Sequence, residues 1–208
     1  MRSPTICDYR KKLKAYFNPS DELILEAIQF EGTLISQVTL SRRITPELAR
    51  IACENNGMAI LCIPEHLQTD ELYLLGLKSN PLLIRYTPEH LLSETIWKEC
   101  LSRCAEVIKF LPDELKDSLT EEEIEKIVRA NGNLIKYIPY SQRTTSVCLI
   151  AAHHFKKGHV LDLVPKRSKT EEICFACLKN KNYGGGACQF IPRKYIDVWK
   201  LIEEEFLY

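Results

Sequence analysis

The chain has 208 residues, of which 45% are apolar and 27% are charged, and its 28 basic and 28 acidic residues give a formal net charge of zero. This balance argues against a dedicated nucleic-acid-binding protein, which usually carries a basic excess. No apolar run approaches the roughly 18 residues of a membrane-spanning helix, and the first residues lack the apolar core of a signal peptide, so we expect no classical secretion. The odd number of cysteines, nine, favours a reducing compartment over a disulfide framework.

Residues 1–19 precede any repeating pattern. They contain the basic stretch Arg10-Lys11-Lys12-Leu13-Lys14 and end at Asn18-Pro19, which breaks the chain. We interpret this segment as an N-terminal leader that is partly mobile, or as a short helix that caps the rest of the chain.

From residue 20 onward the sequence repeats. Six prolines follow equivalent apolar segments at spacings between 24 and 27 residues, and they are Pro64, Pro88, Pro112, Pro139, Pro165 and Pro192. A fixed period of this length is the signature of a repeat architecture.

Each repeat begins with the pattern of an amphipathic helix. One position recurs at the centre of this helix and is Ala, Gly or Cys in six of seven repeats. Its residues are, in order, Ala27, Ala52, Gly76, Cys100, Ile127, Ala151 and Cys177. Apolar residues stand four and three positions before it and one position after it, which is one face of a helix, and only Glu123 interrupts this pattern. A hydroxyl residue suited to cap the helix precedes each one, in the order Ser20, Thr45, Thr69, Ser93, Thr120, Thr144 and Thr170.

The ends of these helices are marked as well. Asn56-Gly57 and Asn131-Gly132 tolerate left-handed geometry, and Asn80-Pro81 also stops a helix. A shorter apolar segment and a proline turn come after each stop. The pattern therefore predicts an all-α protein, a helical-repeat solenoid of about seven two-helix units over residues 20–195, with a C-terminal capping helix over residues 196–208.

This pattern resembles a bacterial helical repeat domain of unknown function, whose units read roughly Ala-Val-Lys-Gln-Asn-Gly-x-Ala-Leu-x-Tyr-Val-Pro-Glu-Glu-Leu. The matching stretches are 52–67, 76–91, 100–115 and 127–139. Similar repeats occur in secreted effectors of intracellular and enteric pathogens. The resemblance brings no catalytic residues or cofactor, and it implies an interaction scaffold delivered into a host cytoplasm.

Two kinds of chemistry would contradict a pure scaffold. Cys174 and Cys177 are spaced like a zinc-binding pair, and further candidate ligands are nearby, namely Cys148, Cys188, His153, His154 and His159. The repeat register instead gives these cysteines packing positions, and a second closely spaced pair is absent. Alternatively, Cys188 stands two positions after the last glycine of Gly184-Gly185-Gly186 and could act as a nucleophile with His153, His154 or His159 as its base.

Two features favour a binding surface. Gly184, Gly185 and Gly186 lengthen one loop of the array, and insertions in repeat proteins often map to a binding face. The residues after the prolines change from acidic in the early repeats to basic in the late ones, where Lys166, Arg167, Arg193 and Lys194 stand. Such an edge suits a charged partner, although solvated turns would also explain it.

We therefore expect a protein–protein interaction scaffold without cofactor, metal or catalysis, most simply a bacterial effector that acts on a host protein. The alternatives are a cysteine- or zinc-dependent enzyme with its site in residues 148–188, and a scaffold that stays in the bacterial cytoplasm. We expect no nucleic-acid partner.

Overall fold

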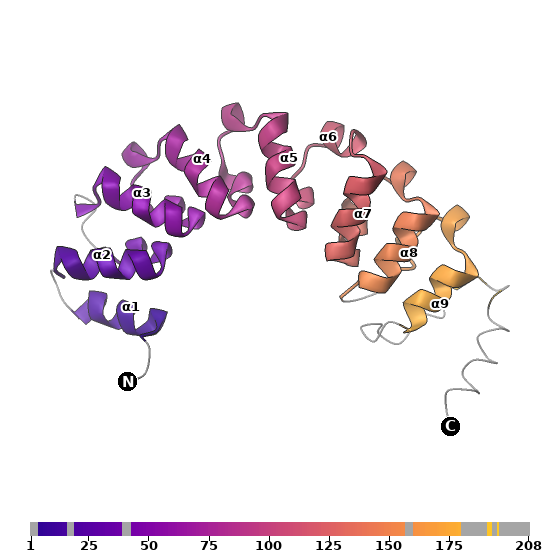
Figure 1. Ribbon diagram of the computed structural model, residues 1–208, viewed down its shortest axis with the longest axis horizontal. Coiled ribbons are helices and arrows are strands. Elements are labelled where there is room, and N and C mark those ends of the chain that lie inside the picture. The colour runs from indigo at the N-terminus through magenta and orange to yellow at the C-terminus, as the bar shows by residue number, and fades with distance from the viewer. Residues whose placement is uncertain are drawn as a thin grey trace, which may run out of the picture. The chain divides into compact units, whose positions relative to one another are not determined.

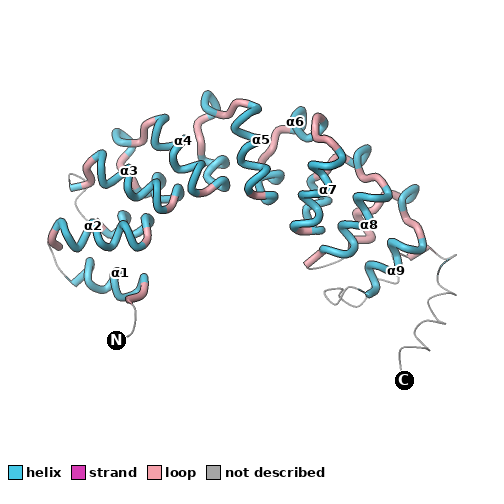
Figure 2. The backbone as a smooth tube through the Cα atoms, viewed as in Figure 1, coloured by secondary structure: helices cyan, strands magenta, loops and turns pink. Residues whose placement is uncertain are grey.

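The computed structural model describes residues 4–15, 19–38, 43–156, 160–179, 191–192 and 195. Every regular element in these ranges is a helix (Figures 1 and 2), which confirms the all-α class. The chain divides into two compact units, Met1–Val107 and Ile108–Tyr208. The predicted capping helix over residues 196–208 lies outside the described ranges.

The first unit contains five α-helices, with 3₁₀ helices between them, in its described part. The α-helices are α1 (Ile6–Ala15), α2 (Asp21–Phe30), α3 (Pro46–Asn55), α4 (Asp70–Ser79) and α5 (Glu94–Arg103). The 3₁₀ helices are η1 (Gly32–Gln37), η3 (Gly57–Cys62), η4 (Glu65–Leu67), η5 (Pro81–Tyr86) and η6 (Glu89–Leu91). Helices α1 to α4 pack side by side in chain order, and α5 packs on η5 (Figure 1).

The second unit has the same alternation. Its α-helices are α6 (Asp113–Asp117), α7 (Glu121–Ala130), α8 (Thr145–His154) and α9 (Glu171–Lys179), and its 3₁₀ helices are η8 (Gly132–Tyr137), η9 (Tyr140–Gln142) and η10 (Lys166–Ser168). Helix α8 packs against α7, η8 and α9. A further 3₁₀ helix, η7 (Ala105–Lys109), includes the division between the units.

The helices begin where the hydroxyl residues predict. Each of the seven hydroxyl oxygens accepts the backbone N–H three residues later, for example Leu48 to Thr45 at 3.2 Å and Ile173 to Thr170 at 3.3 Å. Glu123, which interrupts the apolar pattern, completes a capping box at the start of α7. Its carboxylate accepts the backbone N–H of Thr120 at 2.9 Å, so this position is polar because it stabilises the helix start.

Within each unit the core lies between the α-helices and the 3₁₀ helices. The 3₁₀ helices contribute pairs of fully buried aliphatic side chains, such as Ile60 with Ala59 in η3 and Ile135 with Leu134 in η8. The α-helices contribute the small central residues and their apolar neighbours. The short apolar segments that form η1, η3, η5 and η8 are therefore the second layer of the fold in the described part of the chain.

The expectation of left-handed geometry after the helices is wrong. Asn56 and Asn131 have extended backbones, with φ/ψ of −147°/110° and −161°/107°. Each asparagine side chain instead caps the following 3₁₀ helix by accepting the N–H of the residue two positions on, at 3.1 Å. The glycines next to them lie outside the left-handed region, so a close approach and not a turn requires them.

The N-terminal segment contains a helix that packs on α2. Tyr9 and Leu13 are buried, and the Tyr9 hydroxyl donates to Glu26 Oε1 at 2.7 Å. The ring centroids of Tyr9 and Phe30 lie 4.9 Å apart. Helix α1 therefore has packing contacts with α2, and its role as a cap of the array stays a prediction.

Candidate functional site

Three turns of the second unit lie side by side along one edge. The Gln142 side-chain amide of η9 donates to the carbonyl of Asp117 in α6 at 2.9 Å. On the other side, the Arg167 guanidinium of η10 donates to the carbonyls of Tyr140 and Ser141 at 3.3 and 3.1 Å. We call α6, η9 and η10 together the turn edge.

The turn edge changes sign along its length. Glu114 and Asp117 in α6 are exposed and form no ion pair with any described residue, whereas Asp113 pairs with Lys116 at 2.8 Å. Lys166 and Arg167 in η10 are exposed and pair with no carboxylate in the described part of the chain. The middle turn carries no charge at its first two residues, Tyr140 and Ser141.

Tyr140 is the most exposed large apolar side chain among the described residues, at 57%. The Arg143 guanidinium lies 5.5 Å from its ring centroid. An exposed tyrosine beside arginine side chains has the composition of a protein-binding hot spot.

Arg143 joins the turns through backbone carbonyls. Its guanidinium donates to the carbonyls of Ile138, Leu163 and Lys136 at 3.0, 2.7 and 3.3 Å. Burial lowers the pKa of this guanidinium from its ordinary value. The side chain is thus a structural brace that leaves a positive charge near Tyr140.

The structure brings together two of the predicted binding residues. Lys166 and Arg167 are consecutive and exposed in η10. The other five predicted binding residues, Gly184, Gly185, Gly186, Arg193 and Lys194, lie outside the described ranges. Tyr140 and Arg143 were missed as site residues. The available signal was that Pro139 is followed by tyrosine, where three earlier prolines are followed by an acidic residue.

The cysteines of the alternative site are part of the core in so far as the structure describes them. Cys148, Cys174 and Cys177 are buried between α8 and α9. Burial raises the pKa of the Cys148 thiol to about 11 and that of the Cys177 thiol to about 12. These two thiols are protonated near neutral pH and are poor nucleophiles.

Among the residues that it describes, the structure does not bring the histidines of the alternative site together with a cysteine. His153 and His154 are exposed at the end of α8, and Cys188 and His159 lie outside the described ranges. No three His, Cys, Asp or Glu side chains converge as a metal site within the described part of the chain.

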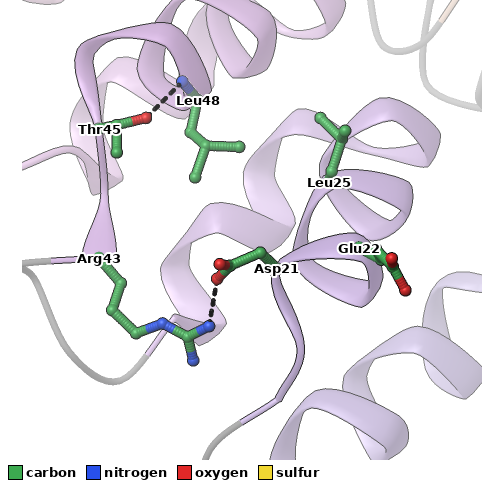
Figure 3. A pocket seen from close by; sticks show the side chains of 6 residues that line it. All are labelled: Asp21, Glu22, Leu25, Arg43, Thr45 and Leu48. Carbon is green, nitrogen blue, oxygen red and sulfur yellow. Dashed lines mark hydrogen bonds and ion pairs between the residues drawn. The ribbon is translucent and has the colours of Figure 1, made fainter.

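A separate open groove of about 520 Å³ lies between α2 and α3 in the first unit (Figure 3). Leu25 and Leu48 give it an apolar lining, and Asp21 and Arg43 form an ion pair at 2.5 Å beside them. Glu22, also in this lining, forms no ion pair with a described residue. The polar groups of the groove are largely used within the chain, so the turn edge offers more free charge for recognition.

The first unit also has two exposed proline turns. Glu65 and His66 of η4 and Glu89 and His90 of η6 are all exposed. His90 Nε2 lies 3.1 Å from a carboxylate oxygen of Asp70 at the start of α4. Each of these turns carries one glutamate beside a histidine, and their described residues include no exposed aromatic side chain comparable to Tyr140.

No protein-family model, curated protein or solved structure matches this chain. Among the described residues, no helix is both long and apolar enough to cross a membrane. Evidence of function therefore comes from the chain's own residues.

Proposed function

We propose that the chain is a protein-binding scaffold, built as a helical-repeat solenoid of about seven two-helix units. The observation that supports this function best is the turn edge, where Tyr140 is 57% exposed beside the cations Lys166 and Arg167, which pair with no described carboxylate. Tyrosine and arginine are both enriched at interface hot spots, where tyrosine contributes a large apolar ring and a hydroxyl that can form hydrogen bonds.

The two ends of the turn edge carry opposite charge, so a charged partner would bind it in one orientation. A partner that binds near η10 would carry acidic groups, and acidic groups would be repelled by Glu114 and Asp117 at the other end of the edge. Such complementarity fixes the register of a partner and raises its association rate more than its affinity. The proposed partner is a protein with a charged surface segment. The proposed context, a bacterial effector in a host cytoplasm, is what the resemblance to the bacterial helical repeat domain implies.

Affinity capture tests the proposal. The wild-type protein, an edge variant (Lys166→Glu, Arg167→Glu) and a control variant (Lys126→Glu, Arg129→Glu) are each exposed to a eukaryotic and a bacterial lysate. Lys126 and Arg129 are also exposed cations of the second unit, but they lie on α7 and pair with glutamates one turn away. Reversing them changes the net charge equally without touching the turn edge.

The expected result is a protein captured by the wild type and by the control variant and lost by the edge variant. Capture in the eukaryotic lysate alone would support the host context, and capture in the bacterial lysate alone would contradict it. Equal capture by all three proteins would reject the turn edge as the contact surface. Failure to capture any protein from either lysate would count against the function.

A further inference from the structure

When a second copy of the turn edge runs in the opposite direction, each of its charged ends faces an end of opposite charge. One end carries the carboxylates of Glu114 and Asp117, the other carries Lys166 and Arg167, and Tyr140 lies in the turn between them. Turning this edge by a half-turn about an axis through Tyr140 places each acidic end opposite a basic end. A surface with this property can bind a second copy of itself through a two-fold axis.

We propose that the turn edge is the contact surface of a two-fold symmetric homodimer. In it, Tyr140 of each copy packs on Tyr140 of the other, and Lys166 and Arg167 of each copy face Glu114 and Asp117 of the other. The inference rests on the proposed function, because it uses the same surface and names a second copy of this chain as a protein that binds there.

Several contacts prepare the edge for this role. The hydrogen bonds of Gln142 to Asp117 and of Arg167 to Tyr140 and Ser141 hold the three turns in fixed register. The Ser168 hydroxyl adds a 3.2 Å hydrogen bond to the Arg143 carbonyl. A partner therefore meets turns whose backbones are already held in place, which lowers the entropy cost of binding.

Alternative assemblies leave parts of this surface unused. A head-to-tail contact would join one acidic end to one basic end, would leave Tyr140 uncovered and would continue into chains of copies. The two-fold arrangement pairs both ends and covers both tyrosines in one closed contact. Three short turns offer a small area, so we expect a dissociation constant in the micromolar range and a strong dependence on salt.

Charge exchange on the purified full chain tests the inference. The base-to-acid variant carries Lys166→Glu and Arg167→Glu, the acid-to-base variant carries Glu114→Lys and Asp117→Lys, and the full exchange carries all four changes. Mass is measured by sedimentation velocity over a concentration series at low and high salt, and circular dichroism checks that each variant is folded.

The wild type should reach the mass of a dimer at low salt and return toward monomer at high salt. Each two-residue variant should be monomeric alone, because both ends of its edge then have the same sign. A mixture of the two should form a heterodimer, and the full exchange should dimerise with itself. Tyr140→Ser should weaken the wild-type dimer by about tenfold or more, as expected for a hot-spot residue.

Three results would overturn the inference. They are a wild type that stays monomeric at every concentration and at low salt, a mixture that fails to restore the dimer, and masses that continue to grow beyond two copies. A monomeric wild type whose edge variant still loses a lysate protein would reject the homodimer and keep the proposed function. A wild type that dimerises through the turn edge but captures no other protein from either lysate would keep the homodimer and reject the binding of another protein.

Discussion

Gly57 lies against the backbone of Gly76 in the next repeat. A Cβ atom added to Gly57 would be 2.1 Å from the Gly76 carbonyl oxygen. The same relationship joins Gly32 to Ala52 and Gly132 to Ala151, where the distance would be 2.2 Å in both cases. The small central residue of one α-helix and the glycine that follows the helix of the preceding repeat, at the start of η1, η3 or η8, are therefore two sides of one backbone contact.

Replacing Gly57 by alanine should destabilise the first unit by about 1 to 3 kcal/mol, because the added methyl group meets backbone that cannot rotate away. Gly76→Ala is the matched comparison. Its Cβ would lie 2.7 Å from Cδ2 of the buried Leu83 and 3.2 Å from the Gly57 Cα, so its nearest backbone contact is about 1 Å longer than that of Gly57→Ala. Alanine is also favoured over glycine inside a helix by about 1 kcal/mol. Urea unfolding monitored by circular dichroism should give a clearly lower midpoint for Gly57→Ala than for Gly76→Ala. Equal midpoints would contradict the backbone contact.

The sequence predicts this fold well where one residue type serves one local purpose. Hydroxyl residues such as Thr45 and Thr170 mark helix starts because only a short polar side chain can accept the orphan N–H groups there. The paired glycine and small residue are visible as two patterns in the sequence. Their contact is not, because nothing in one repeat states which residue of the next it meets.

The site was harder to predict for a related reason. Arg143 binds three carbonyls that lie 5, 7 and 20 residues away along the chain, and no equivalent arginine recurs in the other repeats to reveal a pattern. Tyr140 is distinctive only because the same place in earlier repeats is acidic. Lys166 and Arg167 were found because charge is readable directly, whereas their position beside Tyr140 depends on how the turns pack.

Removing a hydroxyl cap should cost a measurable part of the stability of the second unit. Thr120→Ala removes the acceptor of the Glu123 N–H at 3.3 Å and the hydroxyl that donates to the Glu123 carboxylate at 3.0 Å. The expected loss is about 1 kcal/mol. Thr145→Ala is the control, since Thr145 is the exposed first residue of α8 and Thr144 provides the cap there. Thermal unfolding should show a lower midpoint for Thr120→Ala alone.

The Asn55 side chain connects two neighbouring repeats, and replacing it should change hydrogen exchange at the backbone amide of Gly32. Its side chain accepts the N–H of Gly32 at 2.7 Å and donates to the Gln29 carbonyl at 2.8 Å, which is at the end of α2. Asn55→Ala should cost about 1 to 3 kcal/mol because both backbone groups lose their partner. Hydrogen exchange should quicken at Gly32, while Glu54→Ala, which loses only exposed contacts to Arg50, should leave that amide unchanged. An unchanged Gly32 rate in Asn55→Ala would show that another group holds this amide.

The buried thiols should make the protein lose stability in alkaline solution. Burial raises the pKa of Cys177 to about 12 from an ordinary value of 9.0. The folded thiol therefore keeps its proton in a range where the unfolded thiol loses it. Between about pH 9 and pH 12 the folded state binds more protons, so stability falls as pH rises, and below pH 9 this contribution is fully present.

Urea midpoints at neutral pH and at several alkaline values measure this effect for the wild type and for Cys177→Ala. The variant is expected to be less stable at neutral pH, since it loses packed volume between α8 and α9. Its midpoint should nevertheless fall less steeply with pH, because one titrating thiol is absent. Cys7→Ala is the control, because it removes an exposed thiol without changing the core. Parallel slopes for Cys177→Ala and the wild type would mean that Cys177 ionises equally in the folded and unfolded states. That result would contradict the pKa rise that burial causes.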